Sequence, residues 1–169
     1  IIPLKLANGT LLVKIDTDED IYGLAECRSG QHAQPLIGYI EDVVKPLMVG
    51  RDPLQTERNW DALMFGICGA TTNLPPIVVG VVDTALWDLM GKATGLPVHK
   101  LMGGAARHSV KLYWSTGNGW SKSPEEMLDR VKEGWEQGFR AFKIRMDWRS
   151  YRQDADPEKD FQMFKLCRE

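Results

Sequence analysis

The chain contains 169 residues, of which 43% are hydrophobic and 26% are charged, and this composition is typical of a folded soluble domain. Lys and Arg total 21 against 23 Asp and Glu, so a formal net charge of -2 provides no basic field for nucleic acid or an anionic membrane. No segment approaches the ~18 consecutive apolar residues that a membrane span needs. We therefore expect a soluble protein that binds neither nucleic acid nor a membrane.

The three cysteines, Cys27, Cys68 and Cys167, are widely spaced and form no C-x-x-C pair. They predict neither a disulfide framework nor a zinc ribbon. The N-terminal segment lacks the charged and apolar regions of a signal peptide, which favours a cytoplasmic protein. The chain starts at Ile1 and stops at Glu169 within a helical pattern, so we expect it to be incomplete.

Two short segments near the N-terminus, 11–17 and 21–27, are apolar runs separated by a polar Asp-Glu-Asp turn. They predict an antiparallel hairpin. Helical spacing follows over 35–50, and a second helix is expected over 53–64, with Asp52 as its N-cap and the proline after it at the first helical position. Strands followed by helices indicate an α+β unit.

A long apolar helix is expected over 76–94, ended by Gly95 and by Pro97 just beyond it. The helix contains two acidic residues, Asp83 and Asp88. They could form an acidic site, but carboxylates on a helix that packs in a core commonly serve in capping and ion pairs. We favour this structural interpretation.

From residue 110 onward the pattern alternates between strands and helices. We expect a strand over 110–115, a helix over 123–138, a strand over 141–145, and a further helix that begins at Asp156. This alternation is typical of a parallel βα sheet. The first of these helices has an expected capping box at Ser123 and Glu126 and an apolar stripe at Met127, Val131 and Trp135.

Common metal and nucleotide motifs are absent from the sequence. His32, His99 and His108 are too far apart for an H-E-x-x-H pair. Gly103 and Gly104 lack the spacing of a phosphate-binding loop. A mononucleotide site is therefore not expected.

The strand over 141–145 carries two cations. Because side chains alternate along a strand, Lys143 and Arg145 share one face. Strands of a parallel sheet are usually covered on both faces, so two cations on one face need either water or an anionic partner. The pair is either a solvated face or a cationic site at the carboxyl end of a barrel strand, where (β/α)8 enzymes place their active sites.

Five segments together carry a resemblance to a known family. Segments 82–92, 95–98 and 101–104 resemble the helix and linker that join the capping domain to the barrel in the mandelate racemase and muconate lactonizing enzyme branch of the enolase superfamily. Segment 138–145 resembles that family's second barrel strand, and 17–27 resembles its capping-domain hairpin. The resemblance is collinear over essentially the whole chain.

The resemblance implies an α+β capping domain with linker over 1–107, followed over 108–169 by the first two βα units of a (β/α)8 (TIM-like) barrel. A barrel of this kind takes roughly 250 residues, so the remaining six strands would be absent from this sequence. The resemblance also implies a Mg²⁺-dependent enzyme that removes the proton next to a carboxylate. Such a proton becomes accessible to a side-chain base only when cations stabilise the developing charge.

The resemblance also implies site residues. The family's second strand ends in Lys-x-Lys, and its second lysine is usually the base. Here the motif is Lys143-x-Arg145, so the first position matches the family motif and the second differs from it. Ser115 resembles the position that contacts the substrate carboxylate, and the loop from Arg28 to Gln31 resembles part of the lid that selects substrate. The carboxylate metal ligands would come from later strands, so we expect no metal ligand within this chain.

The function that the resemblance favours is an acid-sugar dehydratase, a lyase of carbohydrate catabolism. It is preferred to a racemase because Arg145 weakens the arrangement of two bases that racemisation needs. A racemase or epimerase, a cycloisomerase, and a catalytically silent homologue that acts as a binding or assembly subunit stay open. A small-molecule carboxylate substrate and a homo-oligomer are expected, and these 169 residues alone are expected to be inactive.

Overall fold

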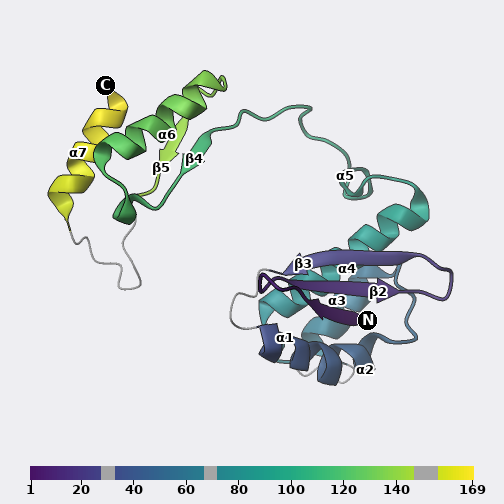
Figure 1. The fold of residues 1–169 in the computed structure, drawn as a ribbon. Helices are drawn as coiled ribbons and strands as arrows, with labels where there is room; N and C mark the ends of the chain where they lie inside the picture. Colours follow the sequence, from purple (N-terminus) through teal and green to yellow (C-terminus); the bar gives the residue numbers. More distant parts are fainter. Residues whose placement is uncertain (28–32, 67–71, 147–155) are drawn as a thin grey trace. The chain divides into compact units, whose positions relative to one another are not determined.

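A computed structural model describes residues 1–27, 33–66, 72–146 and 156–169. The chain forms two compact units, Ile1–Ala106 and Arg107–Glu169, each with its own strands and helices (Figure 1). The domain boundary that the sequence places at residue 107 stays a prediction.

The first unit contains a three-stranded antiparallel sheet of order β1-β2-β3, made of β1 (Ile2–Lys5), β2 (Leu11–Asp16) and β3 (Tyr22–Cys27). The hairpin expected from the sequence is therefore confirmed as β2 and β3, whereas β1 was not predicted. Alternate residues of the sheet face the core, as the period of a strand requires. The buried residues are Leu11, Val13, Ile15, Gly23, Ala25 and Cys27.

Helices follow the sheet in the first unit. The expected helix over 35–50 is present as α1 (Ala33–Tyr39), a π-helical stretch η2 (Ile40–Val44) and α2 (Lys45–Met48), followed by Gly50 at a φ of 83°. Three more helices follow, namely α3 (Thr56–Phe65), α4 (Pro76–Thr94) and α5 (Val98–Leu101).

The start of α3 corrects the expectation that Asp52 is its N-cap. The Asp52 carboxylate accepts a hydrogen bond from the Leu54 amide at 2.9 Å, and its backbone carbonyl accepts one from the side-chain amide of Asn59 at 2.9 Å. Asp52 therefore stabilises a turn before the helix, as short polar side chains often do. The helix begins only at Thr56.

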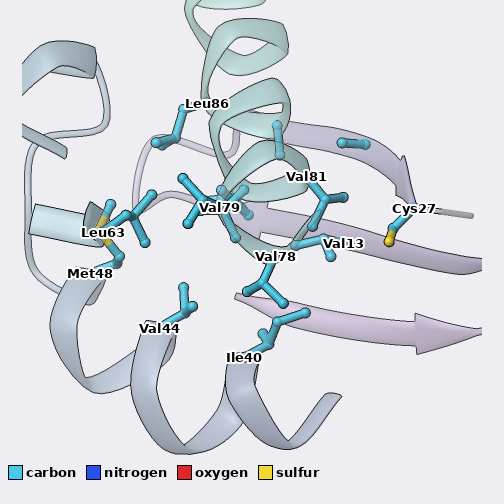
Figure 2. Close-up of a cluster of buried hydrophobic side chains, with 14 of the residues drawn as sticks. Val13, Cys27, Ile40, Val44, Met48, Leu63, Val78, Val79, Val81 and Leu86 are labelled. Carbon is cyan, nitrogen blue, oxygen red and sulfur yellow. The ribbon is translucent and has the colours of Figure 1, made fainter. Parts of the chain in front are cut away.

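Helix α4 has the bounds expected from the sequence, and Gly95 ends it in the left-handed conformation at a φ of 67°. It is apolar on several sides because it packs on β2 and β3 and also contacts α3. Figure 2 shows the resulting core, in which Val78 and Val79 lie near Ile40 and Val44 of the helical layer. No helix among the described residues combines the length and hydropathy needed to cross a bilayer.

Helix α4 approaches the backbone of β3 so closely that only glycine fits between them. A Cβ atom at Gly23 would overlap the carbonyl oxygen of Ala85 and lie 2.9 Å from the Cβ atom of Leu89. Backbone atoms cannot move aside as a flexible side chain can. The absent side chain of Gly23 therefore sets the distance between the helix and the sheet.

Charged residues of α4 hydrogen-bond to the outer edge of β3. The Asp88 carboxylate accepts from the Leu24 amide at 2.8 Å and from the Lys92 ammonium at 2.7 Å. Lys92 also donates to the Tyr22 carbonyl at 2.9 Å and lies 4.2 Å from the centre of the Tyr22 ring. The structural interpretation of Asp88 is confirmed.

The described residues of the second unit form two parallel strands and two α-helices. Strand β4 (Trp114–Thr116) pairs with β5 (Phe142–Ile144), and η3 (Gly119–Ser121) and α6 (Pro124–Glu136) connect them. Helix α7 (Pro157–Arg168) packs against α6. The expected capping box is confirmed, because the Ser123 hydroxyl accepts from the Glu126 amide while the Glu126 carboxylate accepts from the Ser123 amide.

One face of β4 and β5 packs against α6. A Cβ atom at Gly134 would lie 2.5 Å from the Trp114 ring, so glycine makes room for this ring on the helix. The expected apolar stripe is partly wrong: Met127 and Val131 are buried, but Trp135 is 55% exposed. Trp135 instead stacks on Phe142 at a centroid distance of 6.5 Å.

The first strand of this unit is shorter than the sequence predicted. Residues 110–113 of the expected strand 110–115 are exposed and lie outside β4, with Val110 and Leu112 at 65% and 68% exposure. β4 instead extends to Thr116, because its bounds follow its three-residue pairing with β5.

We expect Gly23→Ala to lower the free energy of unfolding by about 3 kcal/mol or more, because the added methyl group meets backbone atoms of α4. Urea unfolding followed by circular dichroism measures this change. Gly80→Ala is the matched control on α4, since nothing lies within 4 Å of its Cβ position, and it should gain up to about 1 kcal/mol from helix propensity. Equal stability of Gly23→Ala and the wild type would contradict the close approach.

Candidate functional site

The carboxyl end of the β4–β5 pair brings together the site residues of the second unit. The register aligns Ser115 with Lys143, so their side chains are neighbours on the same face of the sheet. Both residues are exposed. The opposite face carries Trp114 and Phe142, which contact α6 residues.

Arg145 continues this face one step beyond the strand. Its backbone amide donates to the Thr116 carbonyl at 2.9 Å, which extends the pairing of the two chains. A Cβ atom at Gly117 would lie 3.7 Å from the Cβ and 3.9 Å from the Cδ of Arg145. The stem of Arg145 therefore runs along the backbone of Gly117. Ser115, Lys143 and Arg145 thus lie at one end of one sheet face.

The loop that follows β4 is hydrogen-bonded to the backbone just beyond β5. This loop was not expected from the sequence. The Lys122 ammonium donates to the Gly117 carbonyl at 2.7 Å, and the Gly119 amide donates to the Arg145 carbonyl at 3.2 Å. Asn118 between them has a left-handed φ of 62°. An Asn-Gly pair at a turn is the sequence signal that could have indicated this loop.

The predicted lid residues Arg28 and Gln31 lie outside the described residues. Their role in substrate selection stays a prediction.

The donor chemistry at the strand ends does not fit a metal ion. Mg²⁺ prefers oxygen ligands, above all carboxylates, whereas Lys143 and Arg145 carry only hydrogen-bond donors. In the part of the chain that the structure describes, no three His, Cys, Asp or Glu side chains lie close enough together to hold a metal. The described residues therefore form a cationic surface rather than a magnesium site.

Burial alters the pKa of three further groups, namely the Asp83 carboxyl and the thiols of Cys27 and Cys167. Burial raises the pKa of the Asp83 carboxyl above its ordinary value, and the nearby charge of Glu57 raises this pKa further. Burial also raises the pKa of the Cys27 and Cys167 thiols, and both thiols are free. A raised pKa keeps a thiol protonated and unreactive.

The fold and the matched sequence define a capping domain followed by the start of a (β/α)8 barrel. Residues 2–103 match the N-terminal domain of the mandelate racemase and muconate lactonizing enzyme family. This match covers more than half of the chain, which therefore belongs to the mandelate racemase and muconate lactonizing enzyme family.

Curated relatives extend the match into the second unit. A D-galactonate dehydratase family member RspA from Halomonas elongata is 34% identical over 132 residues, which are 78% of this chain and 32% of that protein. A D-mannonate dehydratase from Rhizorhabdus wittichii is 34% identical over 131 residues, again 78% and 32%. The chain thus spans about a third of the length of these relatives.

Solved structures share the fold over nearly the whole chain. A mandelate racemase/muconate lactonizing protein from Paracoccus denitrificans has a TM-score of 0.83 and 27% identity over 98% of this chain and 46% of that chain. A mandelate racemase/muconate lactonizing protein from Paracoccus denitrificans complexed with magnesium has a TM-score of 0.82 and 26% identity over 98% of this chain and 46% of that chain. A member of the enolase superfamily from Salmonella Typhimurium has a TM-score of 0.78 and 25% identity over 98% of this chain and 50% of that chain.

We expect Asp83→Asn to raise the free energy of unfolding at pH 7. The folded state binds the Asp83 proton more tightly than the unfolded state, so this residue's contribution to stability falls as pH rises from the unfolded pKa through the raised folded pKa. The gain should be below about 1 kcal/mol because the carboxylate keeps contact with water. Urea unfolding at several pH values measures it.

The difference between Asp83→Asn and the wild type should vanish at about pH 3 and below, where the aspartate is protonated in both states. Asp61→Asn, at an exposed position of α3, is the control for removing a carboxylate from a helix of the same unit. A constant difference between about pH 3 and pH 8 would show that the substitution acts through packing rather than charge.

Proposed function

We propose that this chain is part of a Mg²⁺-dependent acid-sugar dehydratase of its family. Relatives that are 34% to 37% identical to this chain are named as dehydratases or as members of a dehydratase family, and these names support the proposal. The substrate would be a small-molecule carboxylate that loses the proton next to its carboxylate and then a hydroxyl group as water. A homo-oligomer and a cytoplasmic location are part of the same proposal.

The observation that carries the proposal is the juxtaposition of Ser115, Lys143 and Arg145 at the carboxyl end of two parallel strands. This end is where (β/α)8 enzymes bind substrate and carry out chemistry. A surface that offers a hydroxyl and two cations suits an anionic substrate, because charge-assisted hydrogen bonds to carboxylates are short and strong.

Lys143 and Arg145 would then have different roles. A guanidinium stays protonated and offers a planar set of donors, so Arg145 would hold the substrate carboxylate or a hydroxyl as a fixed cation. An amine can release and take up a proton, so Lys143 would exchange the proton next to the substrate carboxylate. Ser115, aligned with Lys143, would contact the same carboxylate.

Mg²⁺ would stabilise the negative charge that develops on the substrate when the proton leaves. Its ligands would be residues other than the described ones, which agrees with the cationic character of the strand ends.

We expect Lys143→Met to lower kcat by about 10²–10⁴-fold, the range for loss of a proton-transferring group. The assay is formation of a 2-keto acid from D-galactonate and D-mannonate by a polypeptide that carries a whole barrel. Lys111→Met is the matched control, because Lys111 is exposed and precedes β4 at its amino end. Equal loss in both variants would remove Lys143 from the mechanism.

Two further variants separate the roles of the cation pair. Arg145→Lys should keep the charge but lower kcat/KM, while exchange of the substrate proton in D₂O continues through Lys143. Arg145→Met should lower kcat/KM further. Wild-type kcat/KM for Arg145→Met would mean that the pair is structural and that the site is wrongly assigned.

We expect the 169-residue chain to bind Mg²⁺ no more tightly than an ordinary acidic surface does, because the described residues offer no convergent oxygen ligands. Isothermal titration calorimetry with Mg²⁺ measures this affinity. A tight site of one ion per chain would overturn the placement of the ligands outside the described residues.

A further inference from the structure

The loop after β4, from Gly117 to Lys122, is held at the strand ends by hydrogen bonds to its own backbone. Inside the loop, the Ser121 amide donates to the Asn118 carbonyl at 3.1 Å and the Lys122 amide donates to the Gly119 carbonyl at 3.2 Å. Lys122 also secures the start of the loop through the Gly117 carbonyl at 2.7 Å. The loop is therefore a compact turn beside the cationic face.

Gly119 connects this turn to Arg145. Its amide donates to the Arg145 carbonyl at 3.2 Å, and its own carbonyl accepts from the Lys159 ammonium at 3.0 Å. Gly119 is buried, so its amide depends on the Arg145 carbonyl, while its carbonyl accepts from both the Lys159 ammonium and the Lys122 amide. A single residue thus links Lys159 to the backbone at Arg145.

Lys159 belongs to the first turn of α7, forty positions after Gly119 in the sequence. Its ammonium also lies 3.3 Å from the Trp120 carbonyl. A cation in the first turn of a helix is disfavoured by the helix dipole, so helix formation alone does not account for a lysine at this position. Binding of two loop carbonyls does.

The packing of α7 on the second unit does not require this contact. Met127 and Val131 of α6 and Met163 of α7 are buried, and the two helices pack against each other. Apolar residues already hold the two helices together. The contact of Lys159 therefore has a separate effect, which is to hold the loop after β4 in place.

We propose that Lys159 is a positioning residue that fixes the Gly117–Lys122 loop and, through Gly119, the backbone of Arg145 at the candidate site. Its effect on catalysis rests on the proposed dehydratase function, whereas its effect on the loop does not. Without the ammonium, the Gly119 carbonyl loses a charged donor and the hydrogen bond from Gly119 to Arg145 opens more often.

Amide hydrogen exchange, measured by NMR on the 169-residue chain, tests the loop directly. Lys159→Met keeps the aliphatic stem and removes the charge, and it should speed exchange of the Gly119 amide by about tenfold. Lys159→Arg keeps a cation with several donors and should restore most of the protection. Lys165→Met is the matched control, because Lys165 is an exposed lysine of the same helix.

The proposal is overturned if the Gly119 amide exchanges equally fast in Lys159→Met and Lys165→Met. If Lys159→Met unfolds the second unit, Lys159→Gln takes its place, since its shorter neutral side chain also removes the ammonium. Faster exchange in Lys159→Gln with recovery in Lys159→Arg supports the proposal, and equal exchange in the two overturns it.

Kinetics on a polypeptide with a whole barrel test the catalytic consequence. Lys159→Met should lower kcat by about tenfold with a smaller change in KM, because the misplaced Arg145 matters most in the transition state. If the wild type dehydrates no acid sugar, the proposed function fails while the exchange result still decides the loop. If the wild type is active and Lys159→Met matches Lys165→Met, the catalytic role of Lys159 is overturned.

Discussion

The contact between the Trp114 ring and Gly134 determines which face of the second unit can do chemistry. Because this ring lies against α6, the next residue, Ser115, must lie on the opposite face of β4. The parallel register then places Lys143 beside Ser115. A side chain at position 134 would displace the Trp114 ring and change the orientation of β4. Gly134, on the face of the sheet that packs on α6, therefore supports the cationic surface on the opposite face.

The two units use charge in different ways. In the first unit, one charged pair of α4 serves the fold, because Asp88 binds a strand amide and Lys92. Asp83 does not act in this way, since burial and the charge of Glu57 raise its pKa and disfavour its ionised form. In the second unit, Lys143 and Arg145 lie at the carboxyl end of β5, the end of a barrel strand at which (β/α)8 enzymes place their active sites. The Asp88–Lys92 pair of α4 is therefore structural, and the cations Lys143 and Arg145 are the functional candidates.

The sequence was most informative where a local signal sets the structure. The bounds of α4 follow from Pro76 and Gly95, and the shared face of Lys143 and Arg145 follows from the period of a strand. Lys159 carries no such signal, because its partners are backbone carbonyls about forty positions away. Strand β1 was missed for the same reason. Its pairing with β2 defines it, and its apolar residues Ile2 and Leu4 stay exposed, so no local pattern of buried residues marks it.

The hydrogen bonds that α4 makes to β3 also affect how the sheet can meet other molecules. An edge strand with free amides and carbonyls is a template on which a foreign strand can add and start aggregation. At this edge the Leu24 amide and the Tyr22 carbonyl already bind Asp88 and Lys92. A foreign strand could pair with β3 only after displacing Asp88 and Lys92 of α4 from these backbone groups. The residues that bind α4 to β3 therefore also oppose the addition of a further strand at this edge.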